Sequence, residues 1–389
     1  MFRTTISDQD RDLVMMVREL VQNKIAPRAV EWDSRGGETF DWTAVDLLAE
    51  QNLLAPSAPE EYGGRGLSHL STAMILEEIA AGCGGVATSV AANLHAISPL
   101  LMSGTEEQRL EFIPLLTRKK AKLGAIPLMD NKPNLDIITH SEMVDIRDSS
   151  LSGEPGQDHQ VVNGFKEYVM NGQTASFVTT MFSSAPDGAK KNLQVVLLPM
   201  KTPGLKLAKP RKKFGLRYCS ASELIFEDVA IDNKYLIGKP GSGFLIFMQG
   251  LERMTPYIGA IAVGISRAIY ELALESSKMR FVNGKPFFEE SSVSYVLTDM
   301  ATKLNAARLS VHLACWMIDN EMDSSQASSK AKIISNRYAQ DITKSAMEII
   351  GGRAYLKGFV AEKCLRDAKT LSLIDGSELF HKHLIAGQL

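Results

Sequence analysis

The sequence has few cysteines and no excess of charge of either sign. Its four cysteines lie far apart in 389 residues, form no Cys-x-x-Cys pair and have no spacing typical of a metal site. This usage is typical of a reducing compartment and argues against a disulfide framework. The 43 Lys and Arg residues balance 45 Asp and Glu residues, giving a formal net charge of −2. A basic excess, the usual mark of a nucleic-acid-binding protein, is therefore missing.

Long apolar runs and targeting signals are also missing. The longest apolar stretch, residues 257–266, is closed by Arg267 and is too short to cross a bilayer. The N-terminus has neither the apolar region of a secretory signal nor an Arg-rich transit peptide. A phosphate-binding GxxxxGK[ST] loop, a GxSxG elbow and an HExxH zinc helix are likewise lacking. We therefore expect a cytoplasmic protein with no membrane insertion, no nucleic-acid partner and no metal.

The hydrophobic pattern changes twice along the chain. Residues 1–120 show the helical period, residues 121–238 a period close to two with dense turn signals, and residues 239–389 the helical period again. Asn-Gly pairs at 163–164 and 171–172 are strong hairpin signals in the middle part. The prediction is an α+β multidomain protein: an N-terminal helical domain, a middle antiparallel β domain and a C-terminal four-helix bundle.

The C-terminal bundle is predicted from three long segments. Apolar residues three and four apart recur over 243–279, 292–321 and 325–350, with polar residues opposite. Near the chain end, His381 and His383 are two residues apart, which on a helix indicates a surface pair and not a metal site.

One acid near the C-terminus is a candidate functional group. Asp375 follows an apolar run and precedes Gly376, so its carboxylate is a candidate for a group aimed into a pocket. An ordinary helix-capping Asp explains the pattern equally well. The pair Gly351-Gly352 allows close backbone approach and exposes amides that could bind an anion.

Many short stretches, in order along nearly the whole chain, carry a family resemblance. They are Pro59-Glu60-Glu61-Tyr62-Gly63-Gly64, Gly104-Thr105-Glu106-Glu107-Gln108, Asn163-Gly164-Phe165-Lys166, Gly215-Leu216-Arg217, Phe226-Glu227-Asp228-Val229, Gly241-Ser242-Gly243-Phe244 and Arg366-Asp367-Ala368-Lys369. With them, the chain resembles the acyl-CoA dehydrogenase family. That resemblance implies the same domain order, a tetramer, FAD, an acyl-CoA substrate and an electron-transferring flavoprotein as redox partner.

The resemblance also implies a catalytic base. In one branch of the family a Glu precedes Gly-Thr, and this chain has Asp375 before Gly376 and Ser377, an acid shorter by one methylene and about 1.5 Å of reach. A second branch carries its Glu in the helix after the β domain, where this chain has Met254. Asp375 is thus the implied base. The implied substrate contacts are Glu252, Arg253 and Gly376, while Thr255 replaces a nearby family Arg, so a carrier other than CoA stays open.

Several implied flavin contacts are altered. The family's Thr and Ser in one loop are Met129 and Leu135 here, its Trp-Ile-Thr is Tyr168-Val169-Met170, and a Gln before Ile-x-Gly-Gly is Glu348. The other implied contacts are retained or conservatively changed, namely Arg280, Gly351, Gly352 and Ser377. Lost hydrogen bonds cost about 0.5–1.5 kcal/mol each, so four or five together could weaken flavin binding by several decades. The alternative is drift within a functional branch, with backbone amides that compensate for the lost side-chain bonds.

Three hypotheses follow. The first is an FAD-dependent acyl-CoA dehydrogenase, with Asp375 as base, acting on an unusual branched, cyclic or aromatic acyl group. The second is a flavin-poor or flavin-free subunit of a heteromeric dehydrogenase, so the assembly is either a homotetramer or a heterotetramer with a related subunit. The third is a non-redox acyl-CoA lyase or hydratase on the same fold. The altered Met129, Leu135 and Met170 favour the second and third, and Asp375 favours the first and third.

Overall fold

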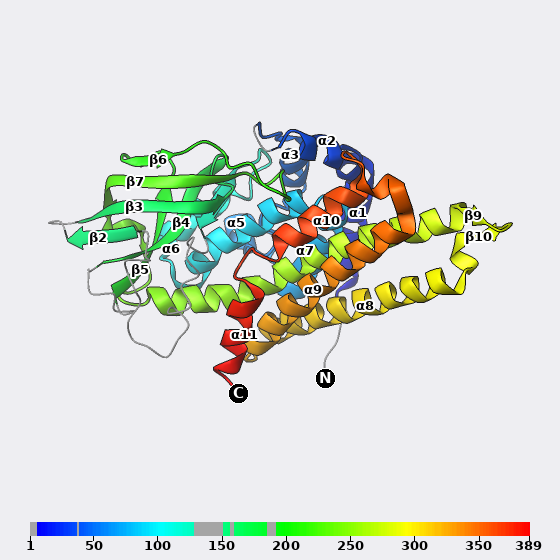
Figure 1. The fold of residues 1–389 in the computed structure, drawn as a ribbon. Coiled ribbons are helices and arrows are strands. Elements are labelled where there is room, and N and C mark those ends of the chain that lie inside the picture. Colours follow the sequence, from blue (N-terminus) through cyan, green and yellow to red (C-terminus); the bar gives the residue numbers. More distant parts are fainter. Residues whose placement is uncertain (1–5, 37–38, 128–150, 156–158, 185–191) are drawn as a thin grey trace.

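The computed structural model describes residues 6–36, 39–127, 151–155, 159–184 and 192–389 (Figure 1). The strands gather at one end of the molecule, and helices from both ends of the chain pack together over the rest of it (Figure 1). The predicted order of helical, β and helical parts is confirmed. The domain boundaries after residues 120 and 238 stay a prediction.

The N-terminal part consists of short and medium helices. Its α-helices are α1 (Asp8–Leu20), α2 (Ala29–Ser34), α3 (Thr43–Glu50), α4 (His69–Gly82), α5 (Gly84–Ser103) and α6 (Glu106–Phe112). Capping side chains fix several starts: the Ser68 hydroxyl accepts the N–H of Ser71 before α4, and Thr105 and Gln108 form a reciprocal capping box before α6. Almost all of α5 is buried, which places this helix in the middle of the core.

The middle part is a single main sheet. Its strands are β1 (Leu123–Pro127), β2 (Leu151–Pro155), β3 (His159–Met170), β4 (Ala175–Ser183), β5 (Leu193–Pro199), β6 (Leu205–Leu207), β7 (Ala221–Asp232) and β8 (Leu236–Ile237). They follow the order β6-β7-β3-β1-β4-β5-β8, with β2 paired to β3 and β4. The prediction of an antiparallel sheet is corrected at two pairs, since β4 runs parallel to both β1 and β2.

The two Asn-Gly signals had different outcomes. Asn163 and Gly164 lie inside β3, where a register shift against β7 marks a bulge, so the predicted hairpin there is wrong. Asn171 does begin a turn, with φ 59° and a hydrogen bond from the Gly172 N–H to the Val169 carbonyl. That turn joins β3 to β4, but β1 lies between them, so it closes no hairpin either. A local turn signal cannot report which strands pair.

The C-terminal part is built on three long helices. They are α7 (Gly243–Met279), α8 (Ser291–Asp319) and α9 (Ser325–Ile350), followed by α10 (Val360–Leu371) and α11 (Glu378–Ala386). A short hairpin of β9 (Phe281–Val282) and β10 (Lys285–Pro286) joins α7 to α8. The predicted helices over 243–279 and 325–350 are confirmed at both ends, and the one over 292–321 to within two residues.

Two hydrophobic clusters hold these parts together. The larger joins helices of both ends of the chain to one face of the sheet, and the smaller lies within the sheet domain. Among the described residues, α5 and α7 are apolar and long enough to cross a membrane, but 89% and 67% of their apolar windows are buried inside the structure. Burial of this extent is the property of core helices.

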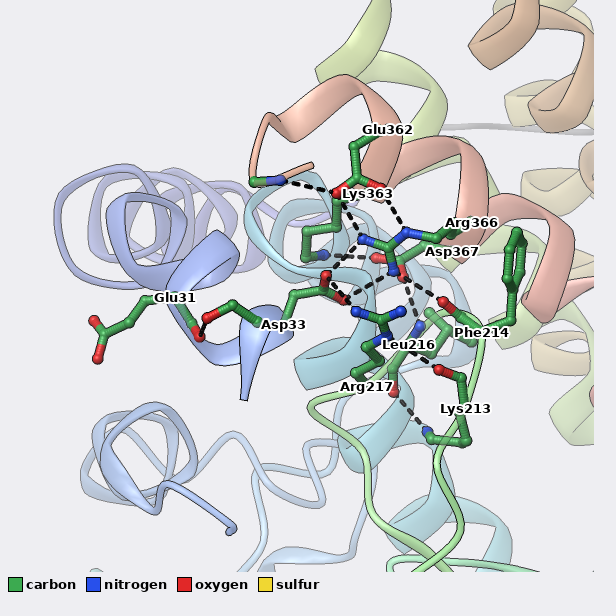
Figure 2. A network of polar contacts seen from close by, with 12 residues as sticks. Glu31, Asp33, Lys213, Phe214, Leu216, Arg217, Glu362, Lys363, Arg366 and Asp367 are labelled. Carbon is green, nitrogen blue, oxygen red and sulfur yellow. Dashed lines mark hydrogen bonds and ion pairs between the residues drawn. The ribbon is translucent and has the colours of Figure 1, made fainter. Parts of the chain in front are cut away.

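A polar network ties α10 to the N-terminal part (Figure 2). The guanidinium of Arg366 donates to both carboxylate oxygens of Asp33 in α2, to Glu362 and to the Phe214 carbonyl. The next residue, Asp367, accepts from Lys363 and from the backbone N–H of Leu216. These contacts fix the position of α10, and the candidate acid follows directly after it in the chain.

Candidate active site

Asp375 lies in a tight turn between α10 and α11. Asp375 and Gly376 both have left-handed backbone, with φ 59° and 88°. A Cβ on Gly376 would lie 2.6 Å from Cδ1 of Phe380, so the turn requires glycine there. The cap of α11 is Ser377, whose hydroxyl accepts the N–H of Phe380 at 3.2 Å. The alternative that Asp375 is an ordinary helix cap is therefore excluded.

The carboxylate of Asp375 is buried, and one of its two oxygens has a hydrogen-bond partner among the described residues. The residue is 3% exposed. The Thr255 hydroxyl, from α7, donates to Oδ2 at 2.8 Å. In the described part of the chain Oδ1 is buried without any hydrogen-bond partner. An unpaired buried atom in a native protein calls for an explanation, and a catalytic role is one such explanation.

The backbone beside this carboxylate is held by a buried imidazole. His381, in α11, is 1% exposed, so the prediction that it forms a surface pair with His383 is wrong. Burial, helped by the charge of Lys332, lowers the pKa of His381 to about 4, and the ring is neutral at pH 7. Its Nε2 lies 2.8 Å from the Asp375 carbonyl, which can only accept, so Nε2 carries the proton and Nδ1 accepts from the Ser329 hydroxyl at 3.1 Å.

A buried lysine reaches the same turn from α9. Lys332 is 2% exposed, and its ammonium donates to the Gly376 carbonyl. Burial lowers its pKa to about 8, while the negative charge of Asp375 acts in the opposite direction. Lys332 therefore remains mostly protonated at pH 7. Sequence analysis missed this residue, whose one signal is a lysine among small residues on a face of α9 that is otherwise buried.

A second imidazole faces the acid from α5. His95 is 2% exposed, and burial lowers its pKa against the opposing effects of the Asp375 charge and a hydrogen bond with the backbone of Met254. Within the described residues its Nε2 has no partner. Two buried polar atoms without partners, Oδ1 of Asp375 and Nε2 of His95, thus belong to side chains that interact electrostatically. Sequence analysis did not single out His95 either.

Two other predicted substrate residues, Glu252 and Arg253, lie on α7 just before Thr255. Met254 is buried and apolar, so the second family position for a base carries none. Oε1 of Glu252 accepts from the hydroxyl and the N–H of Ser324 at the start of α9. Arg253 is exposed, and its charge contributes to the low pKa of His69. Contact of Glu252, Arg253 and Gly376 with substrate stays a prediction.

Four predicted flavin contacts lie at the opposite end of α7. The Arg280 guanidinium stacks on Phe287 at 4.7 Å and forms no ion pair within the described residues. A Cβ on Gly351 would lie 3.6 Å from its Nη1, no described atom lies within 4 Å of the corresponding position on Gly352, and Glu348 is exposed. An exposed cation beside an open pair of glycines fits an anionic group such as a diphosphate.

This second group cannot share one site with Asp375 inside a single chain. Thr255 and Arg280 belong to one helix and its cap, and a rise of about 1.5 Å per residue places them roughly 37 Å apart. The structure therefore brings Gly376 and Ser377 together with Asp375, and separates Arg280, Glu348, Gly351 and Gly352 from them.

The predicted flavin contacts of the sheet are described in part. Tyr168 and Met170 lie on β3, the first 52% exposed and the second buried between Ile126 of β1 and Ala221 of β7. An exposed aromatic ring fits stacking on a flavin, while the buried thioether supplies no hydroxyl. Met129 and Leu135 lie outside the described residues. No cluster of three metal-ligating side chains occurs in the described part of the chain.

Comparison with known proteins identifies the family of the chain. Three family models match: the acyl-CoA dehydrogenase N-terminal domain at residues 7–120, the middle domain at 145–229 and the C-terminal domain at 241–389. The short-chain specific acyl-CoA dehydrogenase of Rattus norvegicus is 32% identical over 96% of this chain and 88% of its own length.

The chain belongs to the acyl-CoA dehydrogenase family. It is accordingly an oxidoreductase of a flavoprotein family that acts on CH–CH donors. The cyclohex-1-ene-1-carbonyl-CoA dehydrogenase of Syntrophus aciditrophicus is 29% identical over 96% of this chain and 87% of its own length. The solved butyryl-CoA dehydrogenase of Megasphaera elsdenii has a TM-score of 0.91 and 26% identity over 99% of this chain and 98% of the other.

Proposed function

We propose that this acyl-CoA dehydrogenase homologue binds FAD and desaturates an acyl-CoA thioester between its α and β carbons, with Asp375 as the base. One observation carries the proposal: Asp375 keeps a buried carboxylate oxygen, Oδ1, without a partner while Thr255 holds the other. A general base needs a positioned oxygen that is free to accept a proton.

The chemistry divides between this oxygen and the cofactor. Oδ1 takes the α-proton as the C–H bond breaks, and the electron pair of that bond becomes part of the new double bond. When bound, FAD supplies the oxidant of the reaction and takes up the hydride that leaves the β-carbon. The buried surroundings of Asp375 keep water away from the abstracted proton.

The residues present fit FAD at more than one point. Arg280 with the open Gly351-Gly352 pair suits the diphosphate, and the exposed ring of Tyr168 suits the isoalloxazine. Arg280 lies roughly 37 Å along α7 from Thr255, which holds Asp375, and this distance supports an FAD site shared between two subunits. A homotetramer, or a heterotetramer with a related subunit, would bring them together, and an electron-transferring flavoprotein would reoxidise the enzyme.

The acyl group is proposed to be branched, cyclic or aromatic. Asp375 ends about 1.5 Å short of where a glutamate would reach, so a bulkier acyl group has more room above the base. The similarity to a cyclohex-1-ene-1-carbonyl-CoA dehydrogenase supports a cyclic substrate, and that to short-chain dehydrogenases supports a linear one as the competing case. The chain is proposed to act in the cytoplasm.

The test begins with the visible spectrum of the full-length protein after incubation with FAD. A bound flavin that bleaches anaerobically with cyclohex-1-ene-1-carbonyl-CoA or butyryl-CoA is the expected result. Asp375→Asn should bind flavin and fail to bleach it, whereas the matched control Glu378→Gln, three residues on and partly exposed, should bleach normally. Bleaching at the normal rate in Asp375→Asn would remove Asp375 from the mechanism.

A second function is favoured by one observation, the burial of Met170 where the family has a hydroxyl. It supports a flavin-poor subunit that completes the FAD site of a partner chain. A protein that stays colourless with FAD, but restores flavin binding when mixed with a related subunit, would establish it. A colourless protein that hydrates or eliminates an acyl-CoA would instead establish the lyase or hydratase.

Sharing of the site between copies has its own test. Asp375→Asn and Arg280→Met subunits should each be inactive alone. If one copy supplies Asp375 and its neighbour Arg280, then co-expressed mixtures contain sites with both intact residues and regain activity. Lys278→Met is the matched control, since Lys278 is an exposed cation two residues before Arg280. Mixtures that remain inactive would contradict a site that combines Asp375 of one copy with Arg280 of its neighbour.

A further inference from the structure

Three helices hold the turn that carries Asp375. Lys332 of α9 donates to the Gly376 carbonyl, His381 of α11 donates to the Asp375 carbonyl, and Thr255 of α7 donates to the carboxylate. A buried carbonyl without a donor is costly, and Asp375 is moreover in the left-handed region that a non-glycine residue adopts only under constraint. The turn therefore depends on donors from outside it.

Three ionisable side chains around this turn interact with the charge of Asp375. They are Lys332 from α9, His381 from α11 and His95 from α5. Both imidazoles have lowered pKa values because of burial, so they are neutral at pH 7. Of these three groups, Lys332 is the cation.

The Lys332 ammonium is held at the turn without taking the free oxygen of the acid. Its hydrogen bond goes to the Gly376 carbonyl, and Oδ1 of Asp375 has no partner among the described residues. A positive charge near a buried carboxylate offsets part of the cost of burying it. The arrangement therefore places a cation at the turn and leaves one carboxylate oxygen free.

We propose that Lys332 and His381 are positioning residues for the base: together they hold the Asp375–Gly376 turn through its two carbonyl groups. Neither touches the substrate. The inference rests on the proposed role of Asp375, but the contact of Lys332 with this turn is a property of the folded chain, and its coupling to Asp375 can be measured without any turnover.

The first experiment is a double-mutant cycle on unfolding. Asp375→Asn, Lys332→Met and the double variant are unfolded in urea at pH 7, without substrate. The two residues should couple by at least about tenfold in the unfolding equilibrium constant, because each single variant leaves a buried charge or donor unpaired. Lys330→Met, an exposed lysine on the same helix, should show no coupling to Asp375→Asn. Additive effects for Lys332 would overturn the inference whatever reaction the protein catalyses.

The second experiment measures the reaction. Lys332→Met should lower kcat by about 100-fold with KM nearly unchanged, since displacement of a catalytic group by about 1 Å has effects of that size. Lys332→Arg, which keeps a donor and a positive charge, should restore at least about tenfold in kcat. A rise in KM with kcat unchanged in Lys332→Met, or no rescue by arginine, would assign Lys332 a structural role only.

His381 gives an independent variant if Lys332→Met does not fold. Gln at position 381 can donate to the Asp375 carbonyl and accept from Ser329, and Leu can do neither. His381→Leu should therefore lose about tenfold or more in kcat, with His381→Gln close to the parent. Equal losses in both variants would contradict a positioning role. Normal coupling in the unfolding cycle with no kinetic effect of any variant would instead refute the proposed function.

Discussion

The hydroxyl of Thr255, in the middle of α7, donates a 2.8 Å hydrogen bond to Oδ2 of Asp375, which lies 120 residues later in the sequence. Both side chains are buried, and the bond joins α7 to the turn between α10 and α11. The hydroxyl determines which oxygen of the carboxylate stays free. Thr255, the residue that stands where the resemblance implies an arginine, thus contacts the candidate acid directly.

Thr255→Val should lower kcat about tenfold. The substitution keeps the shape of the side chain but removes the donor, and a hydrogen bond to a charged group contributes about 1.5–3 kcal/mol. Oδ2 is then left buried without a partner, so the free energy of unfolding should also fall by about 1–3 kcal/mol. Steady-state kinetics and urea unfolding test both effects. Thr255→Ser, which keeps the hydroxyl, is the control, and a Val variant with the parent kcat would contradict the assignment.

The network around Arg366 predicts a large effect on stability (Figure 2). The guanidinium side chain is 10% exposed and pairs with Asp33, whose side chain is 6% exposed, at 2.6 Å. Loss of one partner of a buried ion pair costs about 3–5 kcal/mol, so Arg366→Met should lower the free energy of unfolding by that amount. The expected change is a lower urea midpoint at an unchanged slope.

A surface pair provides the comparison for that experiment. Arg211 pairs with Glu223 at 2.8 Å, but the two side chains are 49% and 24% exposed. Exposed pairs contribute about 0–1 kcal/mol, so Arg211→Met should change the free energy of unfolding by no more than that. Similar losses in both variants would show that the buried network is no stronger than a surface contact.

The long helices could be predicted from sequence because their signal is local. Apolar residues three and four apart define α7 and α9 at both ends, with no knowledge of their partners. The pairing of strands could not be predicted in this way, because it depends on segments that are far apart in the sequence. Asn163-Gly164 has the composition of a hairpin turn, yet it lies inside β3, where pairing with β2 on one side and β7 on the other outweighs the turn preference.

The residues of the candidate site differ in the same way in how far the sequence predicts them. The family resemblance implied Asp375 as the base, while the local pattern of acid, glycine and turn explained an ordinary helix cap equally well. Lys332 and His95 come from helices distant in sequence, and the helical period says only that each lies on some face. Which polar side chain of a helix becomes buried beside the acid is decided by packing, and no periodicity reports it. His381 was even assigned to the surface, because spacing alone cannot tell which face of α11 is covered.

Acid should destabilise the protein between pH 6.5 and about 4. Burial lowers the pKa of His381 and of His69 from 6.5 to about 4. In that window the unfolded chain binds protons that the folded chain excludes, so the free energy of unfolding falls as the pH falls. The loss approaches about 3 kcal/mol for His381 and is smaller for His69, whose side chain is partly exposed.

Thermal unfolding across this pH range measures the effect. The melting temperature of the parent protein should drop steadily below pH 6.5, and His381→Gln should flatten part of that drop because the amide does not titrate. His383→Gln is the matched control, since His383 is exposed on the same helix. An equally steep drop in His381→Gln and the parent would mean that the buried imidazole of His381 is not the group that titrates.

Met170→Thr should strengthen flavin binding. Met170 is buried on β3 at the position where relatives place a hydroxyl, and one regained hydrogen bond of about 0.5–1.5 kcal/mol corresponds to a gain in affinity of about two- to tenfold. Titration of the apoprotein with FAD, followed by fluorescence, measures the change. Met181→Thr, on the neighbouring part of the same sheet in β4, should leave the affinity unchanged. Adding Met129→Thr and Leu135→Ser should increase the gain further, and unchanged affinity in the triple variant would show that these three positions do not face the flavin.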